Sequence, residues 1–442
     1  MKEKHTLILI AALLIICIFA ASAGCIAEKE HVNVIIKIPT HTCIPLTDPD
    51  CRSTTDFIDK AWKAFAEQYT KYDVHADIIT FEQTEHERNI QDCYGTKKAA
   101  DLIVGGYNNF ASFIHDGYAV PLDDVITDEL RNDVSPSFWK ISQAENGKTY
   151  LLPFFCLENI LSYNKDLFRQ AGLEKYISDK VEIQNWTLEE WEDILDTLAE
   201  KLPQGCYPYL MYAKNNQGDA HVLILLRANG ADVFDESGHF NMNTPEGIAS
   251  LKWISDGNAK GWYPKHAEIL EILDNQVLFN NNQLAFYIFN SGFVDTVNSK
   301  DMGFVNFPSA DGKGLSSVFI EGFMAFDNGD AKKLEVVKDF ISYIYANKEW
   351  RDYASAGIPC LNSVANEYGP QIFLGEAFAK NAERVVDYTG NNPNWVGVRA
   401  AFYPVMHDLL SGRLTPEKAA EAIDKNCNAA IDEGYKNSIL HE

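Results

Sequence analysis

The chain has 442 residues, of which 46% are hydrophobic, 12% aromatic and 23% charged. This composition is that of a globular protein with a sizeable core, and it excludes an intrinsically disordered chain. The 63 acidic residues outnumber the 38 lysines and arginines, and the resulting net charge of −25 argues against a nucleic-acid partner, since phosphate binding needs a basic face.

The N-terminal segment is predicted to direct export. Residues 1–24 are expected to be a signal peptide and residues 25–31 a tether. The apolar run at 7–21 is shorter than the ~20 residues of a transmembrane helix. Small residues directly before Cys25 resemble a lipoprotein signal, in which this cysteine is lipidated. An uncleaved anchor is the alternative, and both place the body on the outer face of the cell membrane.

Seven of the nine cysteines follow this segment, and an exported protein permits disulfides. Because seven is an odd number, at least one thiol is free or pairs between chains. Cys43 and Cys51 are the pair nearest in sequence, although a link from either of them to Cys93 is equally possible. The sequence has no CxxC pair and no Cys/His spacing typical of zinc, so no metal site and no cofactor are expected.

Predicted strands and helices alternate from the tether onward. Strands are expected at 32–38, 74–80 and 101–104, and apolar residues at helical spacing predict a helix at 54–70. This rhythm is typical of βαβ units with a mostly parallel sheet. Asn146-Gly147 predicts a hairpin turn.

The same rhythm returns in the second half of the chain. Thr187 and Glu190 form a capping box that starts a helix reaching about residue 201. The remaining predicted elements are helices that start at Thr244-Pro245 and Thr415-Pro416, a helix around 334–344, and strands at 284–289 and 318–326. Two α/β lobes fit this length better than one large sheet.

Three stretches carry a specific pattern. Residues 100–123 combine a strand, a small-residue turn and a helix with a final Pro-Leu-Asp. The second stretch joins residues 147–153 to 161–173 and contains Tyr-Asn-Lys-Asp-Leu-Phe at 163–168. The third is a Gly-Ile-Pro motif within residues 357–364. Together they resemble the extracellular solute-binding proteins of ATP-driven (ABC) importers, in the maltose-binding-like group, over residues 32–435.

The resemblance implies an α/β fold of the periplasmic-binding-protein type, with two lobes and a hinged ligand cleft between them. Lobe 1 would comprise residues 32–155 and 305–345, and lobe 2 residues 156–304 and 346–442. The implied protein is a monomer and no enzyme. It captures a small polar solute, with a sugar or oligosaccharide favoured, and delivers it to a membrane permease. A solute-sensing receptor is an alternative that the sequence does not separate from transport.

Loops that follow the predicted strands supply the first candidate ligand contacts. His41 follows the first strand. Tyr107 and Asn108 follow a glycine pair that allows a ligand to approach the backbone closely. Phe293 follows the strand at 284–289 and could stack on a ligand or pack in the core.

Four further candidates lie at the expected crossovers between the lobes or near them. Phe154 and Glu158 belong to the first crossover. The family pattern has a Glu four residues after the proline, whereas Glu158 comes one residue later and in a regular strand would point to the other face. Either a bulge re-aims Glu158 or it has another role. Glu321 is a charged residue in an apolar strand, next to a glycine that suggests a bulge or a close backbone approach. Trp395 is predicted to lie in an exposed loop.

One enzyme alternative comes from the same fold. Thiaminase-type enzymes resemble this architecture and place a nucleophilic cysteine four residues after the equivalent proline. Here Cys156 comes three residues after Pro153, and Leu157 occupies the fourth position. The sequence has no GxSxG, P-loop, HExxH or GxGxxG motif, so catalysis ranks below binding.

Overall fold

The computed structural model describes residues 29–438 except 41–42, 82–85, 107–109, 215–217, 292–300, 388 and 391. Within these residues the strands are β1 His31–Pro39, β2 Asp73–Phe81, β3 Leu102–Gly106, β4 Leu152–Asn164, β5 Ile183–Gln184, β6 Phe286–Asn290, β7 Met302–Val305, β8 Ser316–Ala325, β9 Ile358–Pro359 and β10 Val385–Val386.

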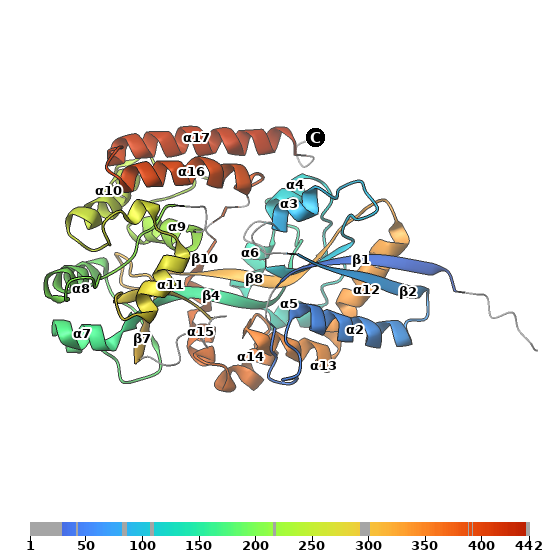
Figure 1. Cartoon of the computed structure of the whole chain (residues 1–442). Coiled ribbons are helices and arrows are strands. Elements are labelled where there is room, and N and C mark those ends of the chain that lie inside the picture. Colours follow the sequence, from blue (N-terminus) through green and yellow to red (C-terminus); the bar gives the residue numbers. More distant parts are fainter. Residues whose placement is uncertain are drawn as a thin grey trace, which may run out of the picture.

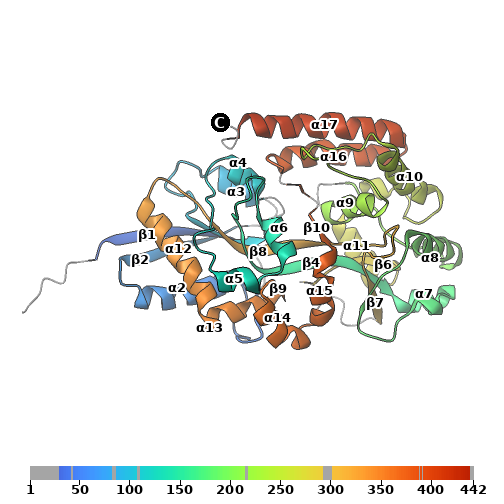
Figure 2. The ribbon, with the colours of Figure 1, turned by 180° about the vertical axis from the view of Figure 1, so that it is seen from behind.

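Helices surround these strands on both sides (Figure 1, Figure 2). Those of the first half of the chain are α2 Thr54–Gln68, α3 His86–Gln91, α4 Ala111–His115, α5 Asp128–Asp133, α6 Pro136–Ser142, α7 Lys165–Ala171, α8 Leu188–Lys201 and α9 Asp219–Ala228. Those of the second half are α10 Pro245–Ala259, α11 Ile272–Asn280, α12 Ala331–Ala346, α13 Lys348–Arg351, α14 Asn362–Tyr368, α15 Gly375–Asn381, α16 Trp395–Leu410 and α17 Pro416–Lys436. Among the described residues, no helix has the length and apolarity needed to cross a bilayer.

The strands form one hydrogen-bonded sheet in the order β2-β1-β3-β8-β4-β7-β5, with β10 on β8 and both β6 and β9 on β4. The expectation of a mostly parallel sheet is wrong. β1 is parallel to β2 and β3, but β3–β8 and every pair that β4 makes are antiparallel. The reason is that β4 and β8 cross between the two halves of the molecule in opposite directions (Figure 1).

Two hydrophobic cores flank the crossing strands. Residues of β4 up to Ile160 belong to the first core, whereas Leu161 and Tyr163 belong to the second. The expected lobe 2 contained all of 346–442, but buried residues from Trp350 to Phe378 belong to the first core. They stay there because β9 pairs with β4 on the side of the first core. The complete lobe boundaries stay a prediction.

The two halves also touch away from the sheet, where the C-terminal end of α17 lies against α4 (Figure 1, Figure 2). His115 Nδ1 is 2.7 Å from Ser438 Oγ, and the His115 ring meets the Tyr435 ring edge-on at 5.4 Å. The N-terminal part of α17 is anchored in the second core, in which Ala420 and Ile423 are fully buried.

The predicted helix starts are confirmed in detail. Thr187 Oγ1 accepts a hydrogen bond from the backbone N–H of Glu190, whose carboxylate accepts one from the N–H of Thr187. Thr244 and Thr415 cap α10 and α17, each followed by proline at the first helical position. Gly147 has φ +73° beside an antiparallel bridge between Gln143 and Thr149, as expected for the hairpin turn.

Gly322 confirms the close backbone approach predicted for the strand that contains it. A Cβ atom on Gly322 would lie 2.1 Å from the carbonyl oxygen of Leu152 in β4. The strands can therefore pair here only because β8 carries no side chain at this position.

Replacing Gly322 with alanine tests this constraint. We expect Gly322→Ala to lower the free energy of unfolding by about 3 kcal/mol or more, because one of two central strands must shift. Urea denaturation measures the change. Gly369→Ala is the matched control, since a Cβ atom there meets nothing within 4 Å and the backbone is helical at φ −50°. Equal losses in the two variants would contradict the steric explanation.

Candidate functional site

Two buried carboxylates lie on opposite faces of the β4–β8 pair. Glu158 in β4 is 1% exposed and pairs with Val318, whereas Glu321 in β8 is 3% exposed and pairs with Phe155. Side chains alternate between the faces of a strand, so Val318 and Glu321, three residues apart, point in opposite directions. The two carboxylates therefore lie in different surroundings, on opposite sides of the sheet.

The orientation of Glu158 depends on an irregularity in β4. The register against β8 shifts between Pro153 and Phe155, so Phe154 is an extra residue in the strand. An extra residue reverses the alternation, and Glu158 takes the face that a residue four after Pro153 would otherwise occupy. Of the two alternatives left open by the sequence, the structure supports the bulge.

Glu158 is part of a network of side-chain amides, of which Asn381 and Asn306 are buried. Asn381, at the end of α15, donates from Nδ2 to Glu158 Oε1. Asn381 and Asn306 exchange two amide hydrogen bonds of 2.8 and 2.9 Å, and Asn306 also donates to Asn185 Oδ1 at 2.8 Å. The Glu158 backbone N–H donates to Ser291 Oγ at 2.9 Å. This network connects β4 to segments that follow β5, β6 and β7, so it fastens the crossover.

Burial raises the pKa of Glu158 to about 7, and hydrogen bonds from Ser316 and Asn381 act in the opposite direction. A carboxyl group in this environment holds its proton up to neutral pH. Ligand contact by Glu158 stays a prediction.

Glu321 lies where two parallel strands end. Gly106, the last residue of β3, pairs with Glu321, and Cys43 after β1 lies within electrostatic range of its carboxylate. The loops after parallel strands are where α/β sheets bind their ligands. His41, Tyr107 and Asn108 belong to these two loops but lie outside the described residues, as does Phe293.

Polar side chains that sequence analysis did not single out continue this face. Asn159 pairs with Ser317 and therefore shares the face of Glu321. Asn159 Nδ2 donates to Ser317 Oγ at 3.2 Å, and its Oδ1 accepts from Asn290 Nδ2 at 2.9 Å. We call Glu321, Asn159, Ser317 and Asn290 the polar row. The available signal was polarity, since Asn159, Ser317 and Glu321 interrupt otherwise apolar strands.

Phe154 and Trp395 pack differently from expectation. Phe154 is 2% exposed, and its ring contacts those of Phe57, Phe323 and Tyr345. The expectation that Trp395 lies in an exposed loop is wrong. It is the first residue of α16, is 1% exposed and belongs to the second core. Asn394 caps this helix by accepting a hydrogen bond from the Gly397 N–H at 3.1 Å, and the helix therefore begins at Trp395.

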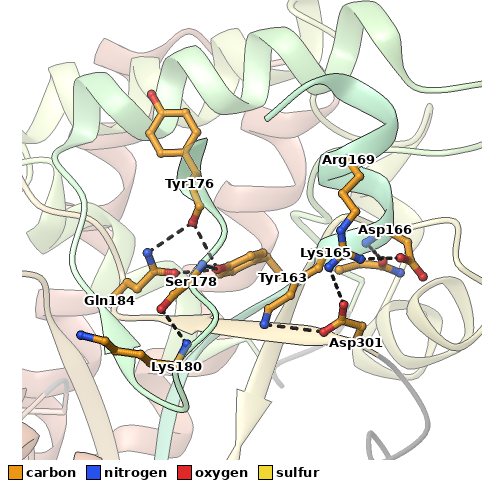
Figure 3. Close-up of polar contacts among 10 residues, drawn as sticks. Tyr163, Lys165, Asp166, Arg169, Tyr176, Ser178, Lys180, Gln184 and Asp301 are labelled. Carbon is orange, nitrogen blue, oxygen red and sulfur yellow. Dashed lines mark hydrogen bonds and ion pairs between the residues drawn. The ribbon is translucent and has the colours of Figure 1, made fainter. Parts of the chain in front are cut away.

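The Tyr-Asn-Lys-Asp-Leu-Phe motif is a structural corner (Figure 3). The Tyr163 hydroxyl, at the end of β4, donates to Gln184 Oε1 at 2.6 Å and accepts from the Ser178 N–H at 3.3 Å. Asn164 caps α7. Arg169 then reaches Asp301 at 2.7 Å. The most specific motif of the chain therefore fastens α7 and β7 to β4, and its side chains are engaged with the protein itself.

The cysteines form two close pairs of thiols. Cys43 and Cys51 are fully buried and in hydrogen-bonding contact, as are Cys156 and Cys360. A hydrogen bond with the Cys360 thiol, together with burial, raises the pKa of the Cys156 thiol. This is the reverse of what activates a cysteine nucleophile. A Cys43–Cys51 disulfide stays a prediction, and the structure brings its two partners together.

A model of the bacterial extracellular solute-binding protein family matches residues 53–349, which is more than half of the chain. A binding protein of Brucella abortus is 23% identical over 210 residues, 46% of this chain and 48% of that protein. The mannitol-binding protein of Pseudomonas aeruginosa is 29% identical over 193 residues, 42% of this chain and 41% of that protein. The chain thus spans about half the length of the curated relatives it matches, or less.

A solved structure matches over a longer range. The cyclic alpha-maltosyl-1,6-maltose binding protein from Arthrobacter globiformis has a TM-score of 0.71 at 19% identity, and the match covers 91% of this chain and 99% of that one. A likeness at this identity shows the fold, and it agrees with the α/β architecture of the periplasmic-binding-protein type expected from the sequence.

The buried carboxyl of Glu158 predicts a pH dependence of stability. Between pH 4.5, its ordinary pKa, and about 7, the folded state keeps the proton that the unfolded state loses. Raising the pH through this window therefore lowers the stability of the wild-type protein by about 3 kcal/mol relative to Glu158→Gln, which does not titrate. Denaturant unfolding of both proteins at several pH values measures the difference. Two curves that stay parallel from pH 4.5 to 7.5 would exclude this effect.

Proposed function

Because the chain belongs to the family of bacterial extracellular solute-binding proteins, we propose that it captures a small polar solute outside the cytoplasm and delivers it to the permease of an ABC importer. The two cores flanking β4 and β8 support this proposal, since a protein with two halves can enclose a ligand and change shape on binding it. The active form is a monomer held at the outer face of the membrane by a lipid on Cys25, which lies outside the described residues.

We propose a sugar, oligosaccharide or sugar alcohol as the solute. The single observation that carries this choice is the polar row beside the carboxyl ends of β1 and β3. It offers one carboxylate, two amides and one hydroxyl, which bond hydroxyl groups as donors and acceptors. One relative is a mannitol-binding protein, and a structural neighbour binds cyclic alpha-maltosyl-1,6-maltose. Tyr107 and Phe293 are proposed to supply the rings on which a sugar stacks, with His41 and Asn108 as further polar contacts.

We propose that the chain binds its solute without catalysis, and the surroundings of Cys156 support this. The thiol one residue from the position used by thiaminase-type enzymes is that of Cys156, which is fully buried beside Cys360. A nucleophile needs a thiolate and access to substrate, and this cysteine has neither. The thiaminase alternative is therefore not favoured.

A ligand screen tests the solute class. We expect mannitol, maltose or a longer maltodextrin to raise the thermal midpoint by several degrees, because a ligand at 100 times its Kd adds about 2.7 kcal/mol to the native state. Differential scanning fluorimetry against sugars, sugar alcohols, amines and vitamins identifies the ligand. Stabilisation by amines or vitamins alone, with no response to any polyhydroxylated compound, would refute the proposed class.

Variants of the polar row then locate the site. Glu321→Gln and Asn159→Ala are each expected to weaken calorimetric affinity for the identified ligand by about 10-fold or more, since each removes a hydrogen bond made in a dry site. Asp116→Asn is the matched control, because its half-buried carboxylate accepts from Gln91 Nε2 at 2.9 Å, away from the row. Wild-type affinity in both row variants would exclude this face as the site.

A further inference from the structure

Two histidines and an aspartate gather on the exposed face of the β1–β2 edge of the sheet. In the parallel register His31 lies opposite Asp73, and Asn33 lies opposite His75. Residues two apart share a face of a strand, so His31, Asp73 and His75 point to the same side. Their ligand atoms all lie within 4.8 Å of one another, and all three side chains are exposed.

The three groups already contact one another. His31 Nδ1 is 3.0 Å from Asp73 Oδ2, and the rings of His31 and His75 lie 4.8 Å apart at a tilt of 45°. The hydrogen bond from His31 lowers the pKa of Asp73, with smaller contributions from His75 and Lys29. The ammonium group of Lys29 donates to the Tyr69 carbonyl at 2.9 Å rather than to the cluster.

Two imidazoles and one carboxylate are a donor set with a defined preference. Imidazole favours Zn²⁺, Cu²⁺ and Ni²⁺ over Mg²⁺ and Ca²⁺, which prefer oxygen ligands. Three protein ligands leave a fourth tetrahedral position for water. Ligand atoms about 2.1 Å from a zinc ion lie about 3.4 Å apart, so rotation of exposed side chains closes the present spread.

We propose that His31, Asp73 and His75 bind one divalent transition-metal ion of the zinc type. The strands hold the ligand-bearing backbone in place, since β1 and β2 pair over nine residues in unbroken register. The net charge of −25 favours accumulation of cations around the protein. Neighbouring Asn33 donates to Asp77 at 2.7 Å, which continues the polar face of the two strands without taking a group from the cluster.

The site lies at the end of the first half that is remote from the second half, where β1 and β2 begin (Figure 1, Figure 2). It is thus separate from the polar row. β2 is the edge of the sheet, and a metal ion would clip this edge strand to β1. Binding to the native state alone stabilises the fold.

Calorimetric titration of the untagged mature chain with ZnCl₂ tests the proposal. We expect one ion per chain with a micromolar Kd. His31→Ala and His75→Ala should each weaken binding at least ~10-fold, and Asp73→Asn should weaken it less. CaCl₂ should give no comparable binding.

His266→Ala is the matched control. His266 is exposed and its Nδ1 lies 3.2 Å from Glu268, so this pair has an imidazole and a carboxylate but not the second imidazole. We expect the affinity of the His266→Ala variant for Zn²⁺ to equal that of the wild-type protein. Circular dichroism confirms that each variant is folded. No binding up to about 1 mM Zn²⁺, or equal binding in the His31→Ala/His75→Ala double variant, would overturn the proposal.

Discussion

Strand β4 is the constraint on which the rest of the structure depends. All thirteen of its residues are buried, and it leaves one hydrophobic core and enters the other without interruption. Each segment that pairs with it must fit against two different environments. This requirement explains why Gly322 carries no side chain opposite Pro153. Strand β8 returns in the opposite direction and therefore pairs antiparallel with β3 and β4.

The two carboxylates on opposite faces of the β4–β8 pair have different roles. The carboxyl of Glu158 accepts from Asn381, which is bonded in turn to Asn306, and burial raises its pKa to about 7, which suits a group that fastens a crossover. Glu321 faces the ends of β1 and β3, where backbone groups of loops become available to a ligand. The one-residue bulge at Phe154 in β4 places the two carboxylates on opposite faces. Without it, the side chain of Glu158 would point to the other face of the sheet.

Local features of the chain were predictable, and non-local ones were less so. Thr187 and Glu190 lie three residues apart and determine a helix start by themselves, so the capping box follows from sequence. The direction of β4 relative to β8 depends on residues more than 150 positions apart, and the period of hydrophobic residues does not encode it. Trp395 was misplaced because Asn394 could end a loop or begin a helix, and only packing against the second core decides between them. Of the candidate site, Glu321 was found by its charge in an apolar strand, whereas Asn159 and Ser317 required the pairing of two distant strands.

The Tyr-Asn-Lys-Asp-Leu-Phe motif, which resembles the family pattern, has a structural role and therefore does not indicate the ligand. Tyr163 bonds Gln184 and Ser178, Asn164 caps α7, and Arg169 pairs with Asp301, so the polar groups of this stretch are used in building one corner of the second half. Such a corner serves any ligand equally well, and a chain that changed it would lose stability rather than specificity. The ligand is chosen by side chains on the strands and in loops after strand ends, where a substitution alters a contact without disturbing either core. Different residues of the same sheet thus determine the fold and the ligand specificity.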